Sequence, residues 1–154
     1  MKTEYVCGFL FDENFESVVL INKNKPEWQK GKLNGVGGKI EPNETPADAM
    51  SREFREEASL DLDPETWNEF AEIIGEGWIV HFFHNNASLT KSIPFLKKLG
   101  IEIHASILKS MTDEKIEVLD VEDIQDDERV IPNLRWLIPM ALDEQHAFCR
   151  ATAK

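Results

Sequence analysis

Short apolar runs and one helical repeat organise this chain. Residues 5–11 (YVCGFLF) and 17–22 (SVVLIN) are rich in β-branched and aromatic side chains, and residues 12–14 form a polar turn between them. This pattern predicts a β-hairpin. Residues 67–75 and 77–85 have the same character and meet at a glycine-rich turn, so they predict two further strands.

A helical repeat begins after residue 45. Thr45 can cap a helix, Pro46 suits the first helical position, and Asp48 stands three residues after the cap. The apolar residues then recur at spacings of three and four, and they are Ala47, Met50, Phe54 and Ala58. The spacing predicts an amphipathic helix with one side in the core.

Two segments before this helix contain little regular structure. Residues 23–32 are polar and predict a loop. Residues 34–38 are too rich in glycine for a helix, and they predict a short strand or turn where the backbone closely approaches another group.

The second half of the chain predicts both strands and helices. Strands are expected at residues 101–108 and 117–121, and a short helix limited by a proline at residues 88–99. Residues 133–147 predict a closing helix, in which Pro139 either introduces a kink or marks the true start. The mixture predicts an α/β (α+β) fold, a sheet covered by helices.

Composition narrows the class of protein. A length of 154 residues fits a single domain, residues 1–154, and 42% hydrophobic with 30% charged residues is typical of soluble globular proteins. We find no apolar run of roughly 20 residues and no signal-peptide pattern. Cys7 and Cys149 do not make a disulfide framework, so we expect a reducing, cytoplasmic environment.

The charge balance limits the partners. The net charge is −12 and no basic patch stands out, which argues against binding to a nucleic acid polymer or to an anionic membrane. A polyanionic substrate would need a metal ion to offset this charge.

Candidate chemistry lies on the helix that follows Thr45. Glu53, Glu56 and Glu57 are at helical spacing and share one face, and Glu44 precedes them. Three like charges repel each other unless a cation sits among them. Hard divalent cations such as Mg²⁺ take oxygen ligands and usually act with substrate phosphates. An acidic helix face is usually only solvated, but the glycines and the spacing here favour a metal site.

These residues resemble the Nudix box, G-x5-E-x7-R-E-U-x-E-E-x-G-U, where U is a bulky apolar residue. Gly38 and Glu44 match the first two fixed positions, and residues 52–60 (REFREEASL) match the rest except that Ser59 replaces the final glycine. We expect Ser59 to adopt the left-handed conformation at modest cost, or the helix end to shift slightly.

The resemblance implies a fold and an activity. Nudix proteins hydrolyse a nucleoside diphosphate linked to a further group X, and their fold is an α/β/α sandwich with a central mixed sheet. The resemblance implies a bracing pair, Arg52 with Glu44, and a site for Mg²⁺, or Mn²⁺ as a substitute. The implied metal ligands are the carbonyl of Gly38 and the carboxylates of Glu53, Glu56 and Glu57. Such a metal neutralises phosphoryl oxygens and activates water.

The base that takes the proton from water varies within this family between a box glutamate and an acid on a later loop. The acidic loop before residues 117–121 makes Glu114 the first candidate and Asp113 the second. Glu56 is the rival within the box.

Four residues are candidates for binding a nucleobase. Trp28 and Trp136 could stack on a base or simply pack. Asn34 has an amide suited to a base edge, although a turn asparagine needs no ligand. Asn133 is either a base contact or a helix N-cap, and we favour the cap.

The histidines and Cys7 have simpler explanations. His81 and His84 are three residues apart on a predicted strand, so they point to opposite faces and do not share a metal. His104 and His146 have no partner at ligand spacing. Cys7 is expected to be a small core residue.

Residues outside the box differ between subtypes of the family, and we use them to predict the substrate. ADP-ribose hydrolases tend to have a proline past the box, and dinucleotide hydrolases a tyrosine there; between Pro64 and Pro94 this chain has neither. A MutT-like (d)NTP pyrophosphohydrolase is therefore the leading interpretation, with 8-oxo-dGTP as one candidate substrate. An ADP-ribose or dinucleotide pyrophosphatase and a catalytically silent nucleotide sensor are the alternatives, while retention of all three box acids favours an enzyme. A monomer and a homodimer both stay open, as does the role of residues 86–100.

Overall fold

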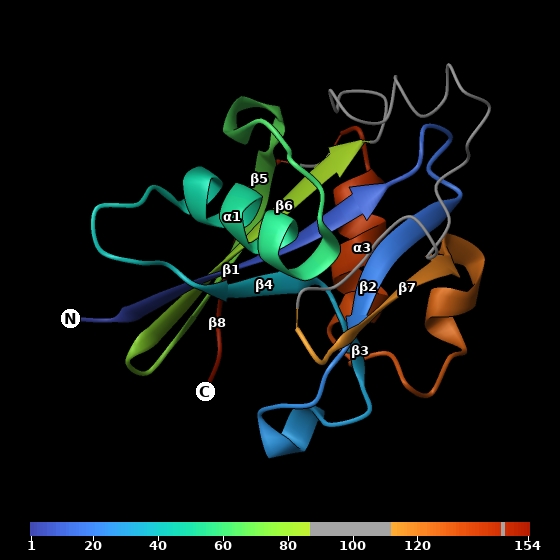
Figure 1. Cartoon of the computed structure of the whole chain (residues 1–154), viewed down its shortest axis with the longest axis horizontal. Helices are drawn as coiled ribbons and strands as arrows, with labels where there is room; N and C mark the ends of the chain where they lie inside the picture. Colours follow the sequence, from blue (N-terminus) through green and yellow to red (C-terminus); the bar gives the residue numbers. More distant parts are fainter. Residues whose placement is uncertain (87–111, 146) are drawn as a thin grey trace.

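A mixed β-sheet organises the molecule (Figure 1). The computed structural model describes residues 1–86, 112–145 and 147–154. Within them the strand order is β3-β2-β1-β6-β5-β8, with β4 paired to β1 and β7 paired to β2. The strands are β1 (Thr3–Phe11), β2 (Ser17–Asn22), β3 (Leu33–Asn34), β4 (Val36–Lys39), β5 (Asn68–Gly75), β6 (Trp78–Asn86), β7 (Lys115–Asp120) and β8 (Cys149–Thr152).

Two local hairpins are joined by a pairing between strands that are far apart in the sequence. β1 and β2 form the predicted antiparallel hairpin, and β5 and β6 form a second one. β1 also runs parallel to β6 over its whole length, from Thr3 opposite Trp78 to Phe11 opposite Asn86. This parallel pair places the first strand at the centre of the sheet.

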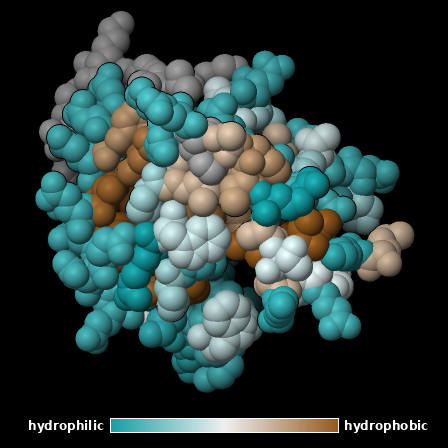
Figure 2. Space-filling model, turned by 180° about the vertical axis from the view of Figure 1, so that it is seen from behind, coloured by the Kyte–Doolittle hydropathy of each residue, from teal (hydrophilic) through white to brown (hydrophobic). Residues whose placement is uncertain are grey.

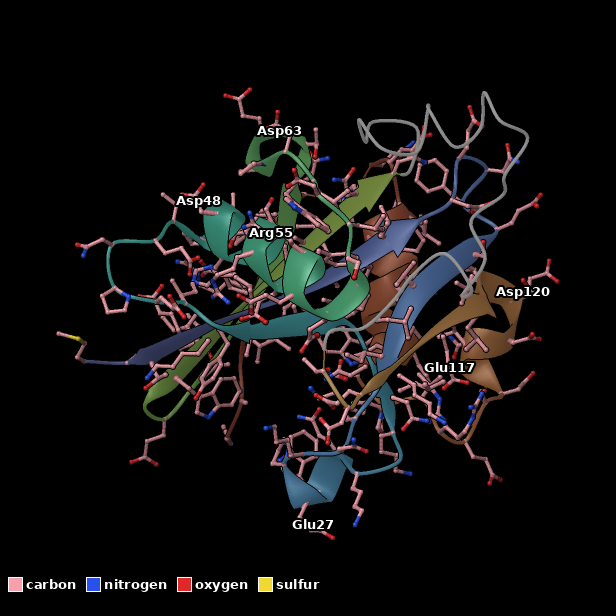
Figure 3. All side chains as sticks on the ribbon, viewed as in Figure 1. Glu27, Asp48, Arg55, Asp63, Glu117 and Asp120 are labelled. Atoms are coloured by element: carbon pink, nitrogen blue, oxygen red, sulfur yellow. The ribbon has the colours of Figure 1, made fainter. Side chains whose placement is uncertain are left out.

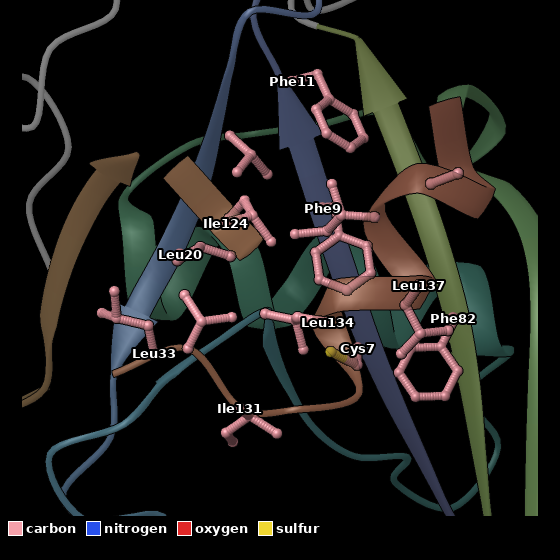
Figure 4. Close-up of a cluster of buried hydrophobic side chains, with 14 of the residues drawn as sticks. Cys7, Phe9, Phe11, Leu20, Leu33, Phe82, Ile124, Ile131, Leu134 and Leu137 are labelled. Atoms are coloured by element: carbon pink, nitrogen blue, oxygen red, sulfur yellow. The ribbon is translucent and has the colours of Figure 1, made fainter. Parts of the chain in front are cut away.

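Two helices cover opposite faces of the sheet. Side chains of β1 alternate between the faces, as the period of a strand requires. Val6 and Leu10 pack with helix α1 (Pro46–Ala58), whereas Phe9 and Phe11 pack with helix α3 (Leu134–Leu142). Figure 4 shows the second cluster, in which Leu134 and Leu137 lie against the sheet. The arrangement is the expected α/β/α sandwich.

Helix α1 forms as the sequence predicts. The hydroxyl of Thr45 accepts a hydrogen bond from the backbone N–H of Asp48 at 3.1 Å, and a carboxylate oxygen of Asp48 accepts from the N–H of Thr45 at 3.4 Å. These reciprocal bonds form a capping box with Pro46 at the first helical position. At the other end Ser59 is left-handed (φ 57°), so the serine adopts the conformation for which glycine is usual.

The closing segment differs from the prediction. The helix expected over residues 133–147 ends at Leu142, and β8 follows, parallel to β5. Pro139 lies inside α3 and has no N–H to donate to the carbonyl of Arg135; the side chain of Gln125 donates to that carbonyl instead, at 2.7 Å. β8 was missed because its four residues gain strand character only from pairing with a distant strand.

The ends of the other predicted elements differ from the structure by one or two residues, and some of the predicted loops contain a short 3₁₀ turn. The polar loop at residues 23–32 contains a 3₁₀ turn, Glu27–Gln29, and the strand expected at 117–121 is β7, which begins at Lys115. Two more 3₁₀ turns are Pro64–Thr66 and Val121–Gln125. The helix and strand expected at 88–99 and 101–108 lie outside the described residues.

The face opposite the view of Figure 1 exposes hydrophobic surface framed by hydrophilic residues (Figure 2). In the part of the chain that the structure describes, none of the helices has both the length and the apolar character needed to span a bilayer.

The capping box gives a test of the fold. Thr45→Ala removes the side-chain acceptor for the N–H of Asp48, so we expect a loss of about 1 kcal/mol in the free energy of unfolding. Urea unfolding followed by circular dichroism measures it. Thr45→Ser keeps the hydroxyl and should retain most of the stability; equal losses in both variants would contradict the capping role.

Candidate active site

Helix α1 presents its acids beside strand β4. Met50, Phe54 and Ala58 are fully buried against the sheet. The exposed residues Asp48 and Arg55 lie on the solvent side (Figure 3). Between these two sides lie the acids of the box. Glu53 and Glu57 are buried, whereas the side chain of Glu56 is half exposed.

Arg52 binds the loop to this acidic edge. Its Nε and Nη2 donate to the two carboxylate oxygens of Glu44 at 2.8 and 3.0 Å, and Nη2 also donates to the carbonyl oxygen of Lys39 at 3.0 Å. Its Nη1 reaches Glu53 at 2.7 Å and Glu56 at 3.4 Å. One guanidinium therefore contacts three carboxylates and holds the segment after β4 against α1.

The guanidinium of Arg52 affects the pKa values of the carboxylates that it contacts. The hydrogen bonds from Arg52 lower the pKa of Glu44 below its usual range. Burial raises the pKa of Glu53, and the hydrogen bond and positive charge of Arg52 only partly oppose that rise. Glu44 is therefore firmly ionised, whereas Glu53 carries a desolvation cost.

The glycines of β4 are required by space. A Cβ on Gly38 would lie 2.3 Å from a carboxylate oxygen of Glu53, and one on Gly37 would lie 2.0 Å from the carbonyl oxygen of Val6. A side chain at Gly37 would push the backbone of β1 away, and one at Gly38 would displace the carboxylate of Glu53. The glycine-rich strand thus lets the backbone approach the acids, as predicted for residues 34–38.

Glu57 is the most perturbed acid of this group. Burial, together with the negative charges of Glu53 and Glu114, raises its pKa to about 7, although Lys23 and a hydrogen bond from the backbone of Gly37 oppose the rise. Its Oε2 atom is buried and has no hydrogen-bond partner in the described structure. A buried carboxylate oxygen in this state requires a cation or a proton.

Glu114 lies next to this group although it is far away in sequence. It is buried, and its two carboxylate oxygens accept hydrogen bonds from Nζ of Lys23 at 3.0 Å and from the backbone N–H of Asn24 at 2.7 Å. Asp113 contributes its carbonyl oxygen to the side chain of Asn24. The structure therefore brings Glu114, but not the carboxylate of Asp113, into the buried contacts beside Glu57. Lys23 was missed because it follows a strand at the start of a polar loop, which gives no local signal.

A cavity of about 630 Å³ opens beside the acids, a size typical of small-molecule sites. Gly38 and Lys23 lie at its wall, and so do Asn34, Trp28 and Asn133. Trp136 is about two-fifths exposed and is not among the described residues that line the cavity. Trp78, which we did not predict, lines it instead, because its strand begins next to β1.

Asn133 does not cap its helix as expected. It occupies the N-cap position of α3 with helical backbone angles (φ −68°, ψ −23°), and its side chain makes no capping hydrogen bond. The N–H of Arg135 already donates to the carbonyl of Pro132, so the cap is supplied by backbone. The Oδ1 atom of Asn133 is buried without a partner in the described structure, at the cavity wall.

A second acidic group lies elsewhere on the sheet. Among the described residues, Glu69, Glu72 and His81 form the one group of three whose ligand atoms all lie within 4.8 Å of one another, and such a group could hold a divalent metal ion. His81 already contacts Glu69 at 2.7 Å through Nδ1 and Glu4 at 3.1 Å through Nε2. The ring of His84 makes a tilted contact with the ring of Phe70, which packs on the α3 side of the sheet, so the prediction that the two histidines point to opposite faces is confirmed.

The box acids offer the donor type that a divalent metal ion takes, although among the described residues no three of their ligand atoms lie within 4.8 Å of one another. Glu57 has an unpartnered buried oxygen, and Gly38 lines the cavity beside the carboxylate of Glu53. Arg52 lies between Glu53 and Glu56 and serves as their positive partner in this structure.

Comparisons with known proteins agree with this geometry. The sequence model of the Nudix domain matches residues 1–145, so the chain belongs to the Nudix family and is a hydrolase of the class that cleaves pyrophosphate bonds of nucleoside diphosphates linked to X. The comparison with curated proteins gives no match.

Solved structures share the fold at low sequence identity. A Nudix hydrolase from Nitrosomonas europaea is 16% identical with a TM-score of 0.67, covering 99% of this chain and 78% of its own. A structure from a study of MutT from Aliivibrio salmonicida and Vibrio cholerae is 14% identical with a TM-score of 0.64, covering 92% and 94%. A MutT protein from Bacillus halodurans is 17% identical with a TM-score of 0.65, covering 94% and 85%.

The raised pKa of Glu57 predicts a pH effect on stability. Between its usual pKa of 4.5 and about 7 the folded state binds more protons than the unfolded state, so the stability present below pH 4.5 is lost as pH rises through 7. Glu57→Gln removes that loss. At pH 8 in EDTA we expect the variant to be more stable than the wild type by up to about 3 kcal/mol, and near pH 5 the gain should shrink.

Urea unfolding at the two pH values measures this effect. Glu56→Gln makes the same chemical change at a half-exposed acid of the same helix and is the matched control. A Glu57→Gln gain of the same size at both pH values would show that the effect is packing and not ionisation.

Proposed function

We propose that this protein hydrolyses a nucleoside triphosphate to the monophosphate and pyrophosphate in a reaction that depends on Mg²⁺. The observation that carries the proposal is the unpartnered buried oxygen of Glu57, whose carboxylate is hydrogen-bonded to the backbone of Gly37, and Gly37 lines a cavity of about 630 Å³. A carboxylate site for a hard cation and a space for a nucleotide thus meet at Gly38. Similarity to structures described as MutT supports the choice of triphosphate.

The carboxylates of Glu53, Glu56 and Glu57 and the carbonyl of Gly38 would hold the metal ion. When bound, Mg²⁺ supplies charge neutralisation on the phosphate oxygens and a water molecule of lowered pKa. Mn²⁺ offers the same ligand preferences. Glu53 and Glu57 are buried, and Nη1 of Arg52 donates a hydrogen bond to Oε1 of Glu53.

Other residues of the chain act on the substrate and on protons. Lys23 places a positive charge at the cavity wall, where it can meet the phosphates. We assign Glu114 as the general base, because it is buried beside Glu57 and because Lys23 and Asn24 hold its carboxylate in one position. Each of its oxygens keeps a second lone pair for a proton. Glu56 is the weaker candidate, since its side chain is half exposed and bound to Arg52.

The nucleobase of the substrate would occupy the part of the cavity lined by Trp28, Asn34 and Asn133. Trp28 is exposed at the cavity mouth and offers a ring for stacking. The unpartnered Oδ1 of Asn133 can accept a hydrogen bond from a base edge. This requirement for a donor fits a purine with a ring N–H, including an oxidised purine such as 8-oxo-dGTP.

A substrate panel tests the function. With Mg²⁺, we expect dNTPs to release pyrophosphate, and EDTA to abolish the release. Glu57→Gln should lower kcat on the order of 10²-fold, the scale of one lost electrostatic contact to developing charge. Glu65→Gln changes an exposed acid outside the site and is the control. Turnover of ADP-ribose or dinucleotides alone would overturn the substrate choice, and binding without turnover would indicate a nucleotide sensor.

A further inference from the structure

The amide of Asn34 is held in one orientation at the wall of the cavity. The oxygen and nitrogen of an amide are told apart by the hydrogen-bond partners of each atom. Here the partners decide, because the backbone N–H of Gly35 donates to Oδ1 of Asn34 at 2.8 Å. If the amide were turned the other way, the N–H of Gly35 would face the amide nitrogen, and two hydrogen-bond donors would oppose each other. The oxygen of Asn34 therefore points into the protein.

Two neighbours reinforce this orientation. A Cβ on Gly35 would lie 2.6 Å from Sγ of Cys7 and 2.8 Å from the ring of Phe9, so the backbone of Gly35 is packed directly on β1. Sγ of Cys7 lies 3.8 Å from Oδ1 of Asn34 and donates to it. Burial raises the pKa of Cys7 to about 12, so its thiol keeps the hydrogen that this contact uses.

Gln29 fixes the other end of the amide. Nδ2 of Asn34 donates to Oε1 of Gln29 at 3.1 Å, across the short loop between the 3₁₀ turn and β3. An amide nitrogen carries two hydrogens, and Gln29 accepts one. No described side chain accepts the second, and Asn34 and Gln29 both line the cavity. Asn34 therefore offers the cavity a donor.

We propose that Gln29 is a positioning residue that sets base selectivity by holding Asn34 as a hydrogen-bond donor toward the nucleobase. The inference rests on the proposed function and adds the chemical class of the base. A base with a carbonyl acceptor at this edge, such as a 6-oxopurine, satisfies the donor. A 6-aminopurine presents an N–H group at the same place and opposes it.

An acceptor complementary to this donor lies in the same cavity. Asn133 lines the same cavity with an unpartnered acceptor oxygen. A 6-oxopurine carries a ring N–H next to its carbonyl, so it can satisfy Asn34 and Asn133 together. Without Gln29 the amide of Asn34 loses the acceptor that holds its nitrogen, and its donor becomes less well directed.

The experiment compares dGTP with dATP for the wild type and three variants. Gln29→Leu removes the acceptor, whereas Gln29→Glu keeps an acceptor in the same place. Lys30→Leu adds the same apolar side chain to an exposed neighbour that is not among the described lining residues. The readout is the ratio of kcat/KM for dGTP to that for dATP, with KM and kcat separated.

We expect the wild type to prefer dGTP and Gln29→Leu to reduce the preference about 10-fold, mainly through KM for dGTP, since one directed hydrogen bond to a base edge is being weakened. Gln29→Glu and Lys30→Leu should keep the wild-type ratio. An unchanged ratio in Gln29→Leu, a loss in kcat alone, or a wild-type preference for dATP would overturn the inference.

Calorimetry with dGMP and dAMP separates this inference from the proposed function. If the wild type hydrolyses no nucleotide, the proposed function fails, and the ratio of the two dissociation constants still tests the role of Gln29. Equal affinities of the wild type for dGMP and dAMP would reject the inference whether or not turnover occurs. Thermal unfolding of Gln29→Leu checks that the variant is folded, and the dAMP affinity shows that its cavity is intact.

Discussion

The acidic edge of α1 depends on one cation within the protein, the guanidinium of Arg52. It bonds both oxygens of Glu44, one oxygen of Glu53 and the carbonyl of Lys39, so it ties the loop after β4 to the helix. Buried carboxylates are unfavourable without such compensation. Arg52 compensates Glu53 but does not reach Glu57, whose Oε2 atom has no partner in the described structure. The helix therefore holds two buried acids of different character, one satisfied by the protein and one that requires a cation or a proton from outside.

The sheet brings the other half of the site to these acids. Lys23 comes directly after β2 and Glu114 directly before β7, and because these two strands pair, the amine and the carboxylate meet 3.0 Å apart. β1 separates the two cores and supplies Cys7, whose thiol donates to Asn34, while β4 pairs with β1 and also contacts the helix. The acids of α1 and the cavity are thus connected through the same short glycine-rich strand, since Gly37 and Gly38 of β4 line the cavity. The two sides differ in character, since acids dominate at the helix and neutral amides and aromatic rings dominate in the cavity.

Several site residues could be predicted from the sequence, and others could not. The shared face of the box acids was predicted because they lie within one helix, where spacing fixes which side chains share a face, whereas the pairing of Arg52 with Glu44 came from the resemblance to the Nudix box. Glu114 was found only as one acid of a loop, and its burial against Lys23 came from strand pairing. Trp136 was predicted to be a candidate base contact, yet Trp78 lines the cavity. The side chain of Asn133 was expected to cap α3, yet it lines the cavity, because the backbone already caps the helix.

The sequence by itself determined the elements whose signals are local. The capped helix α1, the hairpin of β1 and β2 and the box spacing follow from turn chemistry, periodicity and side-chain size within a few residues. Tertiary structure decided what depends on partners far along the chain. β8 exists because β5 offers it a free edge, α3 ends early because the chain must reach that edge, and the pKa of Glu57 is raised because distant strands remove water from around it. Burial and pairing across the sheet are properties of the assembled chain, and no short window of sequence contains them.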